Sequence, residues 1–362
     1  MTTTTRTPAP RSAVTAAANP LTAGQLPGWA TGAVLAAAIV LGTAVTLALG
    51  GFHPGLATVV GLVVFLVVMH VASTIVEGPR KATDRFFRHL VYSAFLLALL
   101  PLVSVVWTTL ADGLRRIDPT FFSYSMRNVV GAGGGAVHAI WGTVIITGIA
   151  ALISVPIGLL TAVYLAEYGG RSALSRGITF FVDVMTGIPS IVAGLFAYAV
   201  FALLFGPGFV SGISGSIALS VLMIPVVVRS TEELLRIVPN ELREASYALG
   251  VPKWKTIVRI VLPTAISGIV AGVILAIARI IGETAPLMIA AGFTQSLNTN
   301  PLSGPMMTLP VFVYDQYARP GIPNEPYWDR AWAGALALIL IVMLLNLAGR
   351  LIARRFAPRA GR

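Results

Sequence analysis

The sequence contains no cysteine, and only 11% of its 362 residues are charged. The absence of cysteine excludes disulfides, zinc–thiolate centres and iron–sulfur clusters. Soluble domains carry about 25% charged residues, whereas this chain is 56% hydrophobic, which is more apolar surface than a water-soluble fold could bury. The scarcity of charge therefore predicts an integral membrane protein whose apolar segments have lipid as their solvent.

Sequence motifs for nucleotide binding, catalysis and metal binding are missing as well. No phosphate-binding loop of the form G-x-x-x-x-G-K-[ST] occurs, so we do not expect this chain to hold nucleotide phosphates itself. The glycine-rich segment 131–135 follows no predicted strand and precedes no lysine. The four histidines are scattered, and no Ser/His/Asp triad or metal-ligand spacing is present. We expect no catalytic residue, metal or cofactor in this chain.

Eight apolar stretches are long enough to span a bilayer, and they predict an all-α polytopic helical bundle. They lie near Trp29–Leu49, Leu56–Ile75, Leu90–Leu110, Ala139–Leu165, Ile178–Phe205, Ile213–Val228, Ala265–Ala291 and Ala331–Leu351. Asp183, Gly187 and Pro189 in the fifth stretch predict a kink or a partly unwound segment. Residues 1–28 predict a disordered tail, and residues 353–362 form a basic tail.

The positive charges predict the orientation of the chain. With eight spans both termini lie on one side, and that side collects nineteen of the 25 Lys and Arg residues, against five on the opposite side and Arg279 inside a span. Because positively charged loops stay on the cytoplasmic side, we expect both termini to be cytoplasmic. The net charge of +11 is therefore assigned to membrane orientation, and no nucleic-acid partner is expected.

A long cytoplasmic loop, PNELREASYALGVPKWKTIVRIVLP (Pro239–Pro263), predicts a short helix–turn–helix at the membrane surface. Asn240 can cap a first helix over Glu241–Leu249. Gly250 stands where a helix end requires the left-handed conformation, and Pro252 suits the first turn of a second helix. On physical grounds this hairpin is either an interfacial amphipathic element without a partner or a rigid projection for a docked cytoplasmic protein.

The spacing of particular residues in this loop is similar to the EAA loop of binding-protein-dependent ABC permeases. The matching residues are Glu244, Ala245, Gly250 and Pro263, and the departure is Ser246, where a second alanine is usual. In that family the first helix of the loop docks on the ATPase subunit. The resemblance implies that all five residues serve ATPase coupling, and that ATP and Mg are bound by the partner ATPase.

Arg279 and Glu283 are two charges deep in the seventh stretch. A charge at mid-bilayer costs about 2.5–3.5 kcal/mol on insertion scales, so both side chains need protein or water around them. Their spacing of four residues predicts one helical face. Two interpretations remain open: a structural ion pair, or a substrate pathway in which Arg279 attracts an anion and Glu283 limits how tightly it binds.

Several segments resemble the PstA-type permease subunits of phosphate ABC importers, from about Phe86 to the C-terminus. They are GAGGGAVHAIWGT, LAEYGG, DVMTGIPSIVAGLFAY, RIIGETAP and YDQYARPGIPNEPYWDRAWAGAL. The resemblance implies a type I ABC-importer permease core of six spans over residues 86–352. A two-span extension over residues 29–76 precedes this core, and its role is not explained by the resemblance.

The resemblance also implies partners and a location. The partners are a PstC-like permease, a PstB-like ATPase dimer, a PstS-like phosphate-binding protein and membrane lipid, in the bacterial plasma membrane. Two alternatives stay open: a permease of the same superfamily for another oxyanion such as sulfate or molybdate, and a non-transporting membrane assembly protein.

Overall fold

The computed structural model describes residues 25–51, 53–170 and 172–356. Most of the predicted N-terminal tail and the last six residues of the basic tail lie outside the described residues. Every regular element in the described ranges is a helix. The chain forms two compact units, residues 1–106 and 107–362, divided inside α3 (Pro79–Gly113). The boundaries 29–76 and 86–352 stay predictions.

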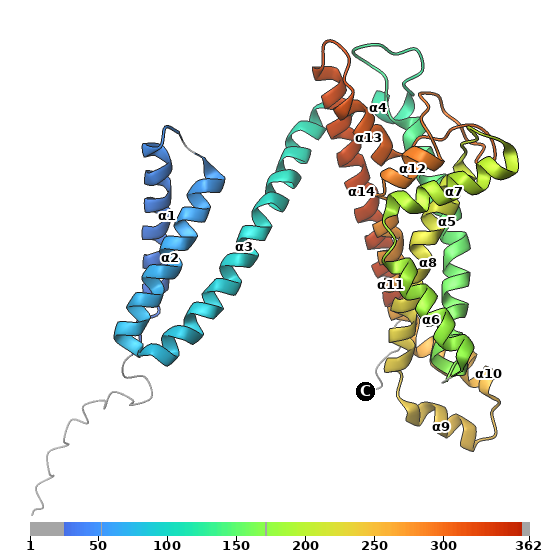
Figure 1. Cartoon of the computed structure of the whole chain (residues 1–362), viewed down its shortest axis with the longest axis horizontal. Helices are drawn as coiled ribbons and strands as arrows, with labels where there is room; N and C mark the ends of the chain where they lie inside the picture. Colours follow the sequence, from blue (N-terminus) through green and yellow to red (C-terminus); the bar gives the residue numbers. More distant parts are fainter. Residues whose placement is uncertain (1–24, 52, 171, 357–362) are drawn as a thin grey trace, which may run out of the picture. The chain divides into compact units, whose positions relative to one another are not determined.

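The first unit contains a helical hairpin of α1 (Ala30–Ala48) and α2 (Pro54–Glu77) (Figure 1). Glycine allows the two backbones to approach closely. A Cβ at Gly42 would lie 2.4 Å from the carbonyl oxygen of Ala57, and one at Gly61 would lie 3.1 Å from that of Ala38. Small residues of this kind are the usual contact between helices in membranes. The predicted two-span extension is thus a tightly packed antiparallel pair.

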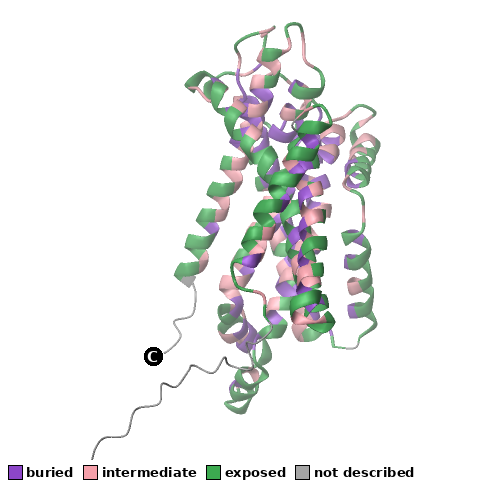
Figure 2. Cartoon of the chain, turned by 90° about the vertical axis from the view of Figure 1, so that its left-hand side faces the viewer, coloured by how far each residue is buried: buried purple, intermediate pink, exposed green. Residues whose placement is uncertain are grey.

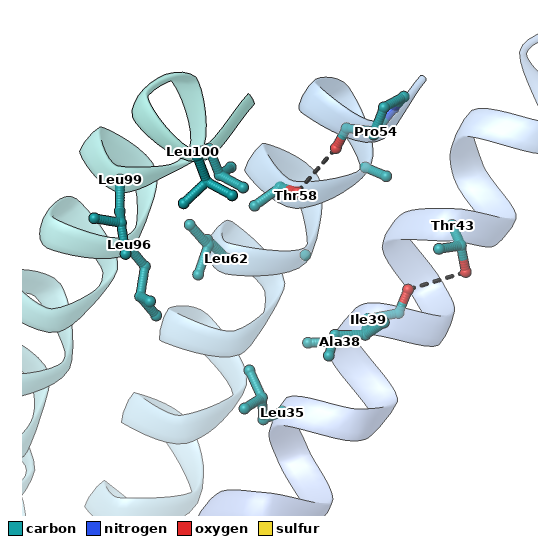
Figure 3. A pocket seen from close by; sticks show the side chains of 13 residues that line it. Leu35, Ala38, Ile39, Thr43, Pro54, Thr58, Leu62, Leu96, Leu99 and Leu100 are labelled. Atoms are coloured by element: carbon teal, nitrogen blue, oxygen red, sulfur yellow. Dashed lines mark hydrogen bonds between the residues drawn. The ribbon is translucent and has the colours of Figure 1, made fainter. Parts of the chain in front are cut away.

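A cavity of about 510 Å³ lies in this unit, between α1, α2 and α3 (Figure 3). Its lining is mainly aliphatic. The hydroxyls of Thr43 and Thr58 donate to the backbone oxygens of Ile39 and Pro54 in their own helices. The lining therefore offers hydrocarbon contact and leaves little polar capacity for a charged solute.

The core of the second unit is the pair α5 (Val137–Val163) and α8 (Gly212–Ile237). Ser216 Oγ donates to the carbonyl oxygen of Ile146 at 3.2 Å, and one turn further Ser220 Oγ donates to that of Ala150 at 3.5 Å. The register advances by four residues on both helices, so they run in the same direction. In Figure 2, buried, intermediate and exposed residues are interleaved along the long helices of the chain.

The parallel direction of α5 and α8 requires the chain to return between them. That return is made by α6 (Ala173–Thr186) and α7 (Ser190–Phe205), which are bent by 108° relative to each other. The break falls at Gly187–Pro189, as predicted, because proline cannot continue the hydrogen-bond ladder of α6. Seven helices in the described residues are long and apolar enough to span, or eight if this bent pair counts as one.

The seventh predicted span is shifted. Its helix begins at Lys253 rather than Ala265 and continues through a π-helical turn (Ile257–Val261) into α11 (Leu262–Ile280). The wide turn precedes Pro263, which has no amide hydrogen to bond back along the helix. The predicted end at Ala291 is also wrong. The helix stops at Ile280, and a short α12 (Ala285–Ala290) with proline in its first turn follows.

The remaining elements surround this core. They are α4 (Pro119–Ser123), α13 (Leu309–Ala318) and α14 (Glu325–Phe356). The long segment after residue 292 contains α13, which packs on α14. Arg330 is fully buried there, and it donates to Gln316 and to the carbonyl oxygens of Gly131 and Gly133. The glycine-rich segment is thereby a fixed structural loop.

Candidate functional site

The loop after α8 forms the predicted helix–turn–helix, with α9 (Asn240–Ala248) as its first helix. Gly250 has a φ of +73°, and its amide donates to the carbonyl oxygen of Tyr247 at 2.9 Å. Only glycine adopts this conformation freely, so the turn that re-aims the chain is confirmed. The predicted cap is wrong: Asn240 is the first helical residue, and its Oδ1 accepts a hydrogen bond from Arg243 instead.

The second helix of the loop differs from the predicted surface hairpin. The short α10 (Lys253–Thr256) does not lie apart from the membrane core, because it continues without a gap into the π-helical turn and α11. The loop is therefore built on the start of a span. A single turn at Gly250 connects α9 to that span.

Ser246, the departure from the usual EAA pattern, has a specific contact. Its hydroxyl lies 2.8 Å from that of Thr256, and both residues are buried. This hydrogen bond joins α9 to α10 across the Gly250 turn. A buried hydroxyl that lacked this partner would carry a desolvation cost of about 1–3 kcal/mol. The serine is thus a structural part of the loop.

The other face of α9 is open to solvent. Glu244 and Ala245 are exposed, and so are the large apolar residues Leu242, Tyr247 and Leu249, the last with 84% of its surface accessible. Ser246 is the only buried residue of this helix. Contiguous apolar exposure outside the membrane spans marks a surface for a protein partner. The exposed glutamate and alanine of the EAA pattern lie on that surface.

The second predicted site, around Arg279 and Glu283, is a cavity of about 250 Å³ in the membrane core. Its walls come from the end of α6, the start of α7, the middle of α8 and the end of α11. The polar side chains in the lining are Thr186, Ser190, Arg279 and Glu283. Since the lining residues Leu222 to Val226 stand near the middle of α8, the cavity lies at about half the depth of the bundle.

The geometry of the charged pair differs from the prediction. Glu283 does not share a helical face with Arg279, because α11 ends at Ile280 and Glu283 follows in a turn. Among the described residues, no ion pair joins these two side chains. Arg279 is exposed in the isolated chain, whereas Glu283 is half-buried. A charged group in a span needs water or protein around it, so the exposed side of Arg279 requires one or the other within the membrane.

Comparison with known proteins assigns the chain to a family. The family model described as "Binding-protein-dependent transport system inner membrane component" matches residues 154–362. The phosphate transport system permease protein PstA 1 of Mycobacterium tuberculosis (strain ATCC 25618 / H37Rv) is 46% identical over 265 residues, 72% of this chain and 84% of that protein. This chain belongs to the inner membrane component family. A further relative, the phosphate transport system permease protein PstA of Yersinia pestis, is 38% identical over 276 residues, 76% of this chain and 92% of that protein.

A solved structure shows the same fold. The MetNI methionine ABC transporter in an inward-facing conformation superposes with a TM-score of 0.50 at 21% identity, covering 61% of this chain and 96% of the matched chain. The described residues of this inner membrane component therefore have the all-helical fold of a type I ABC-importer permease. The match covers nearly all of the other chain but only 61% of this one, so this chain has elements that the matched chain lacks.

Two ion pairs of this inner membrane component were not predicted from the sequence. Asp183 on α6 accepts a hydrogen bond from Arg229 on α8, about one helical turn beyond Val226 in the cavity lining. Glu167, after α5, pairs with Arg243 on α9 at 2.8 Å. The partners stand 46 and 76 residues apart, so no local spacing connects them. The one available signal is Asp183 itself, because an acid inside an apolar stretch requires a partner.

Proposed function

We propose that this chain is the PstA-type permease subunit of an ATP-driven importer of inorganic phosphate. The observation that carries the proposal is its 46% identity to a phosphate transport permease over 72% of the chain. The cavity supports it, because Arg279 places a permanent positive charge halfway through the bundle. Guanidinium groups bind phosphate oxygens through two parallel hydrogen bonds.

The surfaces of the chain support partners of the kind that an ABC importer requires. The exposed α9 face, with Glu244 and Ala245, suits docking of a PstB-like ATPase dimer, which binds ATP and Mg in place of this chain. The exposed side of Arg279 suits a pathway completed by a PstC-like permease. A PstS-like binding protein would deliver phosphate at the external side, and lipid surrounds the apolar helices.

Both termini are proposed to be cytoplasmic, on the basis of the charge asymmetry in the loops. A reporter enzyme fused after Arg362 is expected to be active if it works only in the cytoplasm. A reporter that works only outside the cytoplasm should be silent at the same position. Activity of the external reporter there would contradict an even number of spans with cytoplasmic ends.

Phosphate uptake is the direct test of the function. The chain, co-expressed with its partner permease, ATPase and binding protein in cells that lack other phosphate uptake, is expected to restore accumulation of radiolabelled phosphate. A hundredfold excess of sulfate or molybdate should leave that uptake unchanged, since the relatives are phosphate permeases. Uptake of labelled sulfate or molybdate in place of phosphate would establish the alternative oxyanion permease. If the assembled complex restored uptake of none of these anions, a transport role would be contradicted.

A further inference from the structure

The helix α9, which we call the coupling helix because it carries Glu244 and Ala245, is attached to the membrane core by a largely buried ion pair. Arg243, in the middle of α9, donates from Nη2 and Nε to Oε1 of Glu167 at 2.8 and 3.1 Å. Glu167 lies in the π-helical turn Tyr164–Tyr168 that follows α5. The side chains of Glu167 and Arg243 are only 4% and 13% exposed. A span that is distant in sequence is thereby held directly to the helix that carries the EAA residues.

The same guanidinium also holds the end of α8. It donates to the carbonyl oxygens of Leu235 at 2.9 Å and Val238 at 2.6 Å. Carbonyl groups in the last turn of a helix have no partner within that helix, so Arg243 satisfies groups that would otherwise need water. One side chain of α9 therefore binds both the C-terminal end of α8 and the C-terminal end of α5.

A second cation joins the beginning of the next span to the same point. Lys253, the first residue of α10, donates from Nζ to the backbone oxygen of Glu167 and lies 5.0 Å from the ring centroid of Tyr168. Beneath these contacts the buried residues Leu235 and Val261 belong to one apolar cluster. The cytoplasmic ends of α5, α8 and α10 thus meet at Glu167.

This attachment matters because α9 has little packing of its own. Ser246 is its only buried residue, and the helix is flanked by Pro239 and by the left-handed turn at Gly250. Without Arg243, α9 would be held by its two chain ends and by the Ser246–Thr256 hydrogen bond to α10, with no side-chain link to α5 or to the end of α8. A satisfied network of charged groups in a low-dielectric environment is rigid. The ion pair makes α9 and the ends of three spans move as one body.

We propose that Glu167 and Arg243 are positioning residues that transmit movement of the coupling helix to α5, α8 and the span that continues into α11, of which α8 and α11 line the cavity at Arg279. The proposal rests on the function proposed above, because it assumes a docked ATPase. It assigns no contact with substrate or nucleotide to either residue. The EAA residues receive the ATPase, and the Glu167–Arg243 pair converts its movement into displacement of α5 and α8.

The test separates transport from ATP hydrolysis in the assembled complex. The complex is reconstituted into vesicles with its partner permease, ATPase and phosphate-binding protein, and phosphate uptake and ATP hydrolysis are measured together. Glu167→Gln keeps the size of the side chain but leaves the Arg243 charge unpaired. The ATPase should still co-purify, because Glu244 and Ala245 are untouched. Phosphate moved per ATP hydrolysed is expected to fall roughly fivefold or more, the range of typical coupling between sites.

Two further variants control this result. Arg236→Gln removes a 64% exposed arginine of α8, and its partner Glu232 on the same helix keeps its second ion pair, with Arg229. No charge is left unpaired, so the ratio of phosphate to ATP in this variant should equal that of the wild type. Glu167→Asp keeps the negative charge on a shorter side chain. Its ratio of phosphate to ATP should lie between those of the wild type and Glu167→Gln. A graded ratio distinguishes transmission from a general structural defect.

Two outcomes would overturn the proposal. One is a wild-type ratio of phosphate to ATP in the assembled Glu167→Gln complex. The other is loss of ATPase co-purification or of membrane accumulation in that variant, which would make the pair a folding element. Failure of the proposed function would appear differently, as absence of phosphate uptake by the wild-type complex itself.

Discussion

Replacing Arg279 with glutamine is expected to lower phosphate uptake roughly 10- to 100-fold, because hydrogen bonds to a charged group contribute about 1.5–3 kcal/mol. The guanidinium lines a cavity at mid-depth of the bundle and is the positive group that an anion would meet there. Arg279→Lys should also be impaired, since lysine keeps the charge but lacks the planar fork. The measurement is uptake of radiolabelled phosphate at matched amounts of assembled complex.

The double variant Arg279→Gln with Glu283→Gln separates the two interpretations of the charged pair. A structural pair can be neutralised as a unit at little cost, whereas removal of one member strands the other. If Arg279 attracts the anion, the doubly neutral variant should assemble normally and still fail to transport. Wild-type uptake by this variant would exclude Arg279 from the pathway.

Replacing Gly250 with valine is expected to abolish phosphate uptake while the protein stays in the membrane. The φ of +73° is a strained conformation for a β-branched residue, at a cost of about 1–3 kcal/mol. A Cβ at this position would meet no atom within 4 Å, so the effect comes from the backbone alone. The turn would relax to a negative φ and re-aim α9 relative to α10. Uptake and co-purification of the ATPase are both measured, and both should be lost.

Two controls test whether the position of the glycine matters. Gly208 has a φ of +82° and equally open surroundings, but it lies in the connection between α7 and α8. Gly208→Val imposes the same backbone strain away from the coupling loop and should leave ATPase co-purification intact. Gly250→Asn should be milder than Gly250→Val, since asparagine tolerates the left-handed conformation. Normal uptake and ATPase binding in Gly250→Val would show that this loop does not couple the two subunits.

The candidate site could be predicted only in part. The EAA pattern led to α9, the Gly250 turn and the exposed Glu244, because these depend on residues within one short segment. Ser246 departs from that pattern, and only the folded loop shows the hydrogen bond between its hydroxyl and that of Thr256. The Glu167–Arg243 pair gave no signal in the sequence, since nothing local connects two residues 76 positions apart.

The sequence by itself determined that this protein spans a membrane, that its fifth span breaks at Pro189 and that its coupling loop turns at Gly250. Each of these follows from hydrophobicity or backbone freedom within a few residues. The tertiary structure decided where α11 ends. The predicted span continues past Ile280, but Pro286 packs so closely on Gly194 that a Cβ on this glycine would lie 2.5 Å from the proline Cα. Contact with a distant helix fixes that turn, and with it the cavity shared by Arg279 and Glu283, because neighbours in space are set by packing.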